Sequence, residues 1–197
     1  MAAVEAVVAS SRPGPVEDRV PEPRRVAFDW AEVPLHWIPD DPHTTHVVST
    51  LHMFLPAGER WFVKVFKQAL PLIDDPLLHE QVRAFMSQEG QHATAHDTAR
   101  AHLEAQGLDT SRYVRVLDTF FEELLGDRRL PGPLQRQWLY VRLAAVAAVE
   151  HYTAILGDWV LEQQAWDEAG ADPTMVDLLR WHGAEEVAAC QTAIQHP

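Results

Sequence analysis

The chain has 197 residues, with 29 Asp and Glu against 16 Lys and Arg, and a formal net charge of −13 at pH 7. This balance argues against nucleic acid and anionic lipid as partners, because no net basic surface is available to neutralise phosphates. The single cysteine, Cys190, excludes an intramolecular disulfide and a multi-cysteine metal site. We expect a cytoplasmic protein without a transmembrane segment, because uninterrupted apolar runs are short and the start lacks a basic signal-peptide region.

The N-terminal part of the sequence is not typical of a helix. Residues 1–27 carry four prolines among charged residues and show no periodicity, which predicts a loosely ordered tail. Residues 28–41 combine Trp30 and Trp37 with two prolines, which predicts an extended segment held in place by its aromatic side chains.

Residues 42–197 are typical of helices joined by short connections. Asp-Pro pairs that begin at Asp41, Asp75 and Asp172 predict helix starts, because Asp caps free N–H groups and Pro fits the first helical position. Glycines that suit the left-handed residue after a helix are Gly107, Gly126 and Gly170. The sequence predicts an all-α bundle with helices over 42–72 (interrupted near Pro56–Gly58), 76–106, 110–125, 133–168 and from 173 to the chain end.

The second of these helices carries a motif of metal-ligand type. Glu89, His92 and His96 follow one another at spacings of three and four residues, so they project from one face of the helix. Glu-x-x-His is the spacing used by ferritin-like di-iron and di-manganese proteins, which add a Glu from each of two further helices. The alternative interpretation is a solvated helix face with this spacing by chance.

The predicted helix 133–168 has a carboxylate in its apolar middle. Residues 143–156 are apolar around Glu150 on every face, which predicts a buried helix and a buried charge that must be compensated. A metal ion or an arginine from a neighbouring helix would suffice. Arg142 of the same helix is about 12 Å away along the axis, too far for a direct pair.

Two more helices offer carboxylates. Glu59 follows the predicted break, where the alternative role is a charge favoured at a helix start. In the last helix, His182 and Glu186 are four residues apart and share one face, whereas we expect Glu185 to lie outside the ligand set. Ordinary core or surface positions are expected for the other histidines considered, which are His43, His46, His52, His79, His102 and His151.

Five motifs occur in one order along the chain: Phe54-Leu-Pro-Ala-Gly-Glu59-Arg-Trp-Phe62, Asp75-Pro76, Gln88-Glu89-Gly-Gln-His92-Ala-Thr-Ala-His96, Ala148-Val-Glu150-His151-Tyr-Thr153 and Trp181-His182-Gly-Ala-Glu185-Glu186. On these motifs, residues 42–193 resemble the bacterial family of predicted metal-dependent hydrolases. The resemblance implies a ferritin-like bundle that binds two divalent ions, Fe or Mn in preference to Zn. The implied metal-binding residues are Glu59, Glu89, His92, His96, Glu150, His182 and Glu186.

The chain departs from the family pattern in its last helix. Members usually have a second Glu-x-x-His there, and Ala189 stands in the place of that histidine. Either His182 or water fills the position, or the second ion binds weakly, or the site is degenerate. Relatives also generally run longer, so the bundle is expected to lack C-terminal helices.

Three functions follow as alternatives. The first is a di-metal hydrolase acting on a small, apolar substrate, with the metals driving the reaction because no nucleophile motif such as Gly-x-Ser-x-Gly is present. The second is an O₂-activating di-iron oxidoreductase. The third is a helical protein without catalysis, owing to Ala189. A homodimer is one expected form of the protein.

Overall fold

The computed structural model describes residues 20, 24 and 26–194, and side chains up to residue 189. The predicted tail 1–27 falls almost wholly outside these residues. The described part is all-α and contains no strand, which confirms the predicted class and a helical bundle. Its elements in chain order are α2 (Pro42–Ser49), α3 (Leu51–Ala69), η2 (Leu70–Leu72), α4 (Pro76–Ala105), α5 (Ser111–Asp118), the π-helical segment η3 (Thr119–Leu124), α6 (Gly132–Glu162), α7 (Ala165–Glu168) and α8 (Pro173–Ile194).

The chain divides into two compact units. Of the described residues, the central unit consists mainly of Thr50–Ala148, and the terminal unit of Val26–Ser49 and residues 149–194. Helix α6 is continuous and contributes its first part to the central unit and its last part to the terminal unit.

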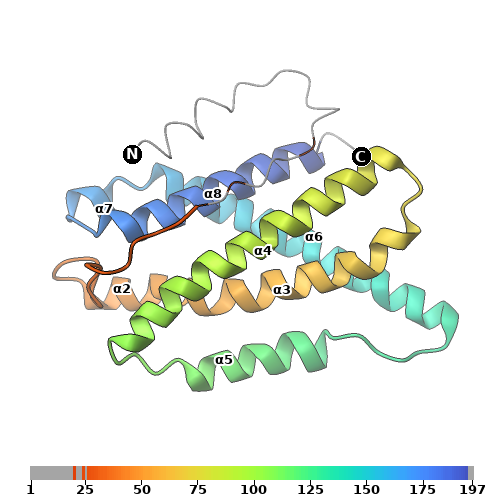
Figure 1. Cartoon of the computed structure of the whole chain (residues 1–197), viewed down its shortest axis with the longest axis horizontal. Helices are drawn as coiled ribbons and strands as arrows, with labels where there is room; N and C mark the ends of the chain where they lie inside the picture. The colour runs from red at the N-terminus through yellow and green to blue at the C-terminus, as the bar shows by residue number, and fades with distance from the viewer. Residues whose placement is uncertain (1–19, 21–23, 25, 195–197) are drawn as a thin grey trace. The chain divides into compact units, whose positions relative to one another are not determined.

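In the central unit, α3 packs along α4, and α5 with η3 covers another side of α3 (Figure 1). An aromatic cluster joins these elements, because the Phe121 ring of η3 lies 5.8 Å from Phe54 and 5.7 Å from Trp61 of α3, centroid to centroid. The indole Nε1 of Trp61 donates to the Leu125 carbonyl at 2.9 Å, which fixes the end of η3. Helix α3 therefore packs against both α4 and η3.

The predicted break at Pro56–Gly58 is wrong, because α3 runs through it without interruption and the chain is interrupted at Thr50 instead. Proline in a helix interior removes one backbone hydrogen bond, and here packing outweighs that loss. All three residues are buried. A Cβ on Gly58 would lie 3.5 Å from the Phe121 ring, an ordinary van der Waals contact, so this glycine lies in α3 against η3 and does not end a helix.

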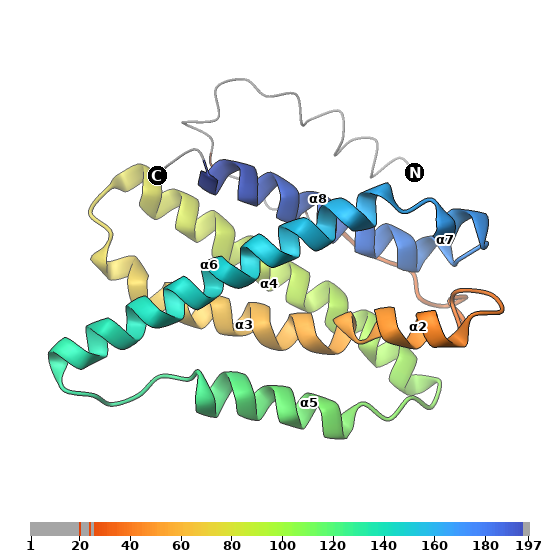
Figure 2. The same cartoon turned by 180° about the vertical axis from the view of Figure 1, so that it is seen from behind.

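In the terminal unit, the segment before α2 is tied to α2, α7 and α8. The Trp37 indole donates to Ser49 Oγ at 3.0 Å and lies 6.0 Å from the Trp166 ring, while the Trp37 carbonyl accepts from Asp172 N–H at 2.7 Å. The last part of α6 runs beside α8 (Figure 2), where Gly157 and Gly183 allow the two backbones to touch.

An ion pair closes the connection between α7 and α8. Arg180 binds the Asp167 carboxylate and donates to the Gln163 carbonyl at 2.6 Å. Hydrogen bonding to this guanidinium lowers the pKa of Asp167 below its ordinary value.

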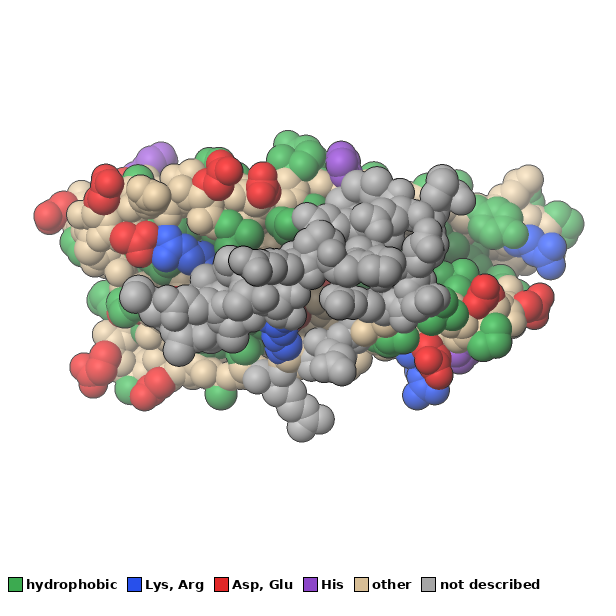
Figure 3. Space-filling model, turned by 90° about the horizontal axis from the view of Figure 1, so that it is seen from above, with side chains coloured by type: hydrophobic (Ala, Val, Ile, Leu, Met, Phe, Trp, Pro, Cys, Tyr) green, Lys and Arg blue, Asp and Glu red, His purple; other side chains and the backbone are tan. Residues whose placement is uncertain are grey.

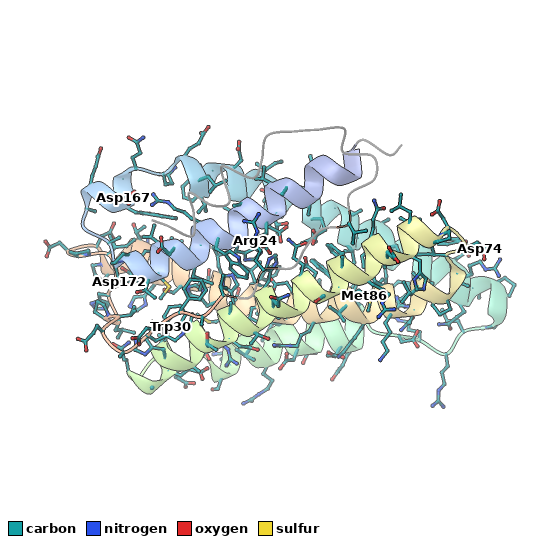
Figure 4. All side chains as sticks on the ribbon, turned by 45° about the horizontal axis from the view of Figure 1, so that its top comes forward. Arg24, Trp30, Asp74, Met86, Asp167 and Asp172 are labelled. Atoms are coloured by element: carbon teal, nitrogen blue, oxygen red, sulfur yellow. The ribbon has the colours of Figure 1, made fainter. Side chains whose placement is uncertain are left out.

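The predicted capping role of the aspartates at the helix starts is confirmed. Asp41, Asp75 and Asp172 each accept hydrogen bonds from N–H groups of the first turn that follows. Asp172 is labelled at the start of α8 in Figure 4. Gly107 and Gly170 have positive φ values of 102° and 70°, as the predicted stops require.

Of the other two predicted ends, one is found without the expected conformation and one is wrong. The helical stretch of α5 and η3 ends at Leu124, before Gly126 as predicted, but Gly126 does not adopt a positive φ, and a Cβ there would lie 1.8 Å from the Glu122 carbonyl oxygen. The helix predicted over 133–168 ends at Glu162, and α7 is a separate turn. The cause at this second end is tertiary, because the Gln163 carbonyl accepts from Arg180 outside the helix.

The prediction that the middle of this helix is buried on every face is also wrong. Within residues 143–156, Tyr152 and Ile155 are 74% and 55% exposed, and Ala144, Ala148 and His151 are exposed as well. By length and composition alone α6 could cross a membrane, since an 18-residue window has a mean hydropathy of 1.3 and is 22% buried, and a single such helix is weak evidence for a membrane span. Elsewhere acidic side chains are scattered over the face drawn in Figure 3.

Candidate metal centre

In the central unit, three predicted ligands come together from two helices. Glu59 of α3 and Glu89 and His92 of α4 are 2%, 1% and 0% exposed. Glu89 Oε1 lies 3.8 Å from His92 Nδ1, and Glu59 can present an oxygen within 4.8 Å of a His92 ring nitrogen. Two atoms that each bind one ion at about 2.0–2.2 Å lie at most about 4.3 Å apart. The Glu89–His92 spacing therefore fits a shared ion, and we call these three residues the central set.

A histidine pair lies farther along the same two helices. His96 of α4 and His52 of α3 are both 0% exposed, and their Nδ1 atoms are 2.8 Å apart. One Nδ1 must donate and the other accept, so the contact couples the tautomers of the two imidazoles and orients both rings. Because His96 lies one turn after His92, His52 helps to orient the face of α4 that carries the central set.

In the terminal unit, Glu186 of α8 is bound by two neighbours. Its Oε1 lies 3.0 Å from His182 Nε2, and its Oε2 accepts from the Thr153 hydroxyl of α6 at 2.6 Å. Glu186 and His182 are 4% and 5% exposed. We call Thr153, His182 and Glu186 the terminal set. The His182 imidazole thus lies directly against the Glu186 carboxylate.

The remaining acidic candidates differ in burial. Glu150 is half-buried, and its backbone carbonyl lies 3.0 Å from the Thr153 hydroxyl oxygen, whose single proton is also directed at Glu186. Glu185, which the sequence places outside the ligand set, is 5% exposed in α8. Burial alone thus does not separate Glu185 from Glu186, and the contacts seen for Glu186 are those with Thr153 and His182.

Arg142 of α6 pairs with residues other than Glu150, as its distance from Glu150 along the helix predicts. Arg142 is 2% exposed and donates to Gln68 Oε1 of α3 at 2.6 Å, with Asp127 3.5 Å away. Burial lowers the pKa of its guanidinium below the ordinary value, and the Asp127 carboxylate acts in the opposite direction. Arg142 therefore serves to attach the first part of α6 to α3.

The donor sets suit divalent ions of intermediate hardness. Carboxylate oxygen and neutral imidazole nitrogen are ligands of Mn, Fe and Zn, and no thiolate takes part in either set. A carboxylate as buried as Glu59 or Glu89 carries a large desolvation cost, which a divalent cation offsets. The chemistry and the burial of the central set thus fit a metal site.

Two residues in these contacts were not predicted to have a role. His52 was expected to be an ordinary histidine, although it lies seven residues before Glu59 and so two turns away on the same helix face. Thr153 lies three residues after Glu150, inside the motif quoted for the resemblance. His52 and Thr153 each lie on the same helix face as a candidate carboxylate, Glu59 and Glu150 respectively. This spacing was the signal in the sequence that could have identified them.

A family model described as predicted metal-dependent hydrolase matches residues 22–188. This range includes every residue of the central and terminal sets. Neither the curated proteins nor the solved structures contain a match.

Proposed function

Because the chain belongs to the family of predicted metal-dependent hydrolases, we propose that it is an enzyme whose two divalent ions are held by carboxylates from four helices. The proposed ligands are Glu59, Glu89, His92, Glu150 and Glu186, with His182 and His96 completing the donors. The proposed substrate is a small, apolar molecule with a hydrolysable bond.

The observation that carries this proposal is the buried carboxylate–imidazole group of the central set. The order of motifs along the chain adds the terminal set, because a ferritin-like di-metal site takes Glu-x-x-His from one helix and further carboxylates from others. The terminal set supports the same proposal within its own unit, since Glu186 is buried and already oriented by two side chains.

The side chains of the central and terminal sets can bind divalent ions and hold one another in the orientation that binding requires. When bound, divalent ions polarise a substrate oxygen or a water, which permits hydrolysis without a protein nucleophile. Thr153 and His182 hold opposite oxygens of Glu186, so this carboxylate keeps one rotamer. His52 fixes the ring of His96. Such pre-orientation spares the site the cost of ordering its side chains when an ion arrives.

Metal analysis tests the proposal directly. Protein purified without oxygen and reconstituted with Mn²⁺ or Fe²⁺ is expected to retain two divalent ions per chain after desalting. Under the same anaerobic conditions, Mn²⁺- or Zn²⁺-loaded protein is expected to hydrolyse simple aromatic esters or phosphoesters, and metal-free protein is not. Absence of retained metal after reconstitution would contradict the proposal.

A second candidate function is an O₂-activating di-iron oxidoreductase. The carboxylate-rich donors of the central set favour it, since ferritin-like di-iron proteins use such sets. Activity that requires Fe²⁺ and O₂, together with an optical change when O₂ is admitted, is the expected result for this alternative. Hydrolysis by Zn²⁺-loaded protein without O₂ distinguishes the hydrolase.

Ala189→His tests whether an imidazole is lacking beside Glu186. Ala189 is half-buried three residues after Glu186, so a histidine there would restore the usual Glu-x-x-His spacing. We expect affinity for the second ion to rise by about tenfold or more, comparable to the effect of a residue that supports a metal ligand. Titration calorimetry with Mn²⁺ measures this, and Ala188→His, at the exposed neighbouring position, is the matched control. Equal affinities in both variants would show that His182 already completes the site.

A further inference from the structure

The outer face of α6 is apolar and exposed along most of the helix. Tyr140, Val141, Tyr152, Ile155 and Trp159 are between 47% and 74% exposed. The alanines between them, at positions 144, 147 and 148, are exposed as well. Exposed apolar side chains are common singly, but a continuous row on one helix marks an interaction surface.

Eight of the exposed positions of α6 have the spacing of a coiled-coil seam, and Tyr140, Tyr152 and Trp159 lie directly beside it. Successive members are separated by three and four residues in strict alternation, which keeps them on one line of a helix that faces a partner helix. The seam consists of Leu134, Gln137, Val141, Ala144, Ala148, His151, Ile155 and Asp158, all of them exposed. Small side chains at its middle allow a second helix to approach closely.

We propose that this seam binds the same seam of a second copy of the chain, with the two α6 helices antiparallel. The alternation is symmetric about Val146, so an antiparallel partner maps the seam onto itself. Ala144 then faces the partner's Ala148, Val141 faces the partner's His151 and Gln137 faces the partner's Ile155. Such self-complementarity is what a two-fold interface requires.

Charge at the two ends of the seam favours the same arrangement. Arg136 and Asp158 are exposed and flank the apolar stretch. In the antiparallel register, Arg136 of one subunit and Asp158 of the other are offset by about 3 Å along the helix axis, and this pair occurs at both ends of the interface. A parallel pair would instead place each charge beside its own kind, which is unfavourable.

A second copy fits this face better than a bilayer does. Lipid would surround α6, yet its inner face packs in the central unit, where Arg142 is 2% exposed and donates to Gln68. Glu150 also lies within the helix and is half-buried. The apolar surface is therefore one stripe of a packed helix, in the manner of a subunit interface.

Sedimentation of the full chain tests the proposal. Wild-type protein is expected to sediment at twice the monomer mass of 22.2 kDa. Ala144→Arg places two like charges near the symmetry axis and is expected to weaken the dimer by about 100-fold or more. Leu78→Arg is the matched control, because Leu78 of α4 is exposed to a similar degree, 47%, outside the seam. A monomeric wild type, or a dimer insensitive to Ala144→Arg, would overturn the proposal.

Disulfide trapping tests the register and does not depend on the stability of the arginine variant. In a Cys190→Ser background, a size-tagged Ala144→Cys chain is mixed with Ala148→Cys under glutathione disulfide. The mixed disulfide is expected to exceed both homodisulfides. Homodisulfides in excess would contradict the antiparallel register. Flotation of wild-type monomers with phosphatidylcholine vesicles, abolished by Ala144→Arg, would assign the face to lipid and overturn the proposal.

Discussion

Glu89→Gln is expected to lower divalent-metal affinity by more than about 100-fold, beyond the 10- to 100-fold effect of residues that merely support ligands. The substitution keeps the volume of a side chain that is 1% exposed and removes its charge. Because burying a charged carboxylate is costly, the metal-free variant is expected to be as stable as metal-free wild type or more so. Metal content by mass spectrometry and thermal unfolding with and without Mn²⁺ measure both effects.

The stability readout separates a ligand from a structural residue. At an ion concentration of about 100 Kd, binding stabilises the native state by about 2.7 kcal/mol, which raises the Tm of a chain of this size by roughly 5–10 °C. Wild type is expected to show this shift and Glu89→Gln to lose it. Glu80→Gln, an exposed glutamate of the same helix, is the control and is expected to keep the shift.

The neighbouring glutamates of α8 offer a matched pair for the terminal set. Glu186→Gln is expected to remove one ion per chain, whereas Glu185→Gln is expected to retain both, although the two carboxylates are almost equally buried. Equal loss in the two variants would contradict the assignment of Glu186, whose contacts with Thr153 and His182 distinguish it.

Gly157→Ala is expected to destabilise the protein by about 3 kcal/mol, the upper end of the usual range for overpacking. A Cβ on Gly157 would lie 2.6 Å from the Gly183 carbonyl oxygen and 2.9 Å from its Cα. Backbone atoms cannot rotate away as a flexible side chain would, so α6 and α8 must separate. A Tm lower by roughly 6–12 °C is the expected observation in calorimetry.

Gly90→Ala is the matched control for this prediction. Gly90 is also an interior helical glycine, but a Cβ there would meet nothing within 4 Å. Alanine at such a position is expected to stabilise the protein by about 0.5–1 kcal/mol. A similar rise in Tm for Gly157→Ala and Gly90→Ala would show that the two helices do not approach as closely as described.

The local parts of the fold were predictable from the sequence. An Asp-Pro pair specifies a helix start by itself, because the capping carboxylate and the N–H groups it binds are at most three residues apart. The starts at residues 42, 76 and 173 were therefore predicted to the residue. The spacing of Glu89 and His92 was equally local, and the structure places both on the buried side of α4.

Features that depend on a distant partner were missed. Pro56–Gly58 was interpreted as a break, since its effect depends on the Phe121 ring, far along the chain. The contact of His52 with His96 joins residues 44 positions apart and has no local signal beyond helix spacing. The exposed face of α6 was interpreted as core because hydrophobicity alone does not say which neighbour covers a helix.

The composition of the terminal unit has a consequence for the order of folding during synthesis. The terminal unit combines two segments that are far apart in the sequence, one that ends at Ser49 and one that begins at Val149. The central unit is formed mainly from the single stretch Thr50–Ala148. A ribosome delivers the N-terminus first, and contacts between distant segments form slowly. Trp37 is 1% exposed and its carbonyl accepts from Asp172 N–H, so its native contacts cannot form until the start of α8 has been synthesised. We therefore expect the central unit to acquire structure first. The carboxylates of Glu59 and Glu89 would then be available to an ion before Glu186 has been translated.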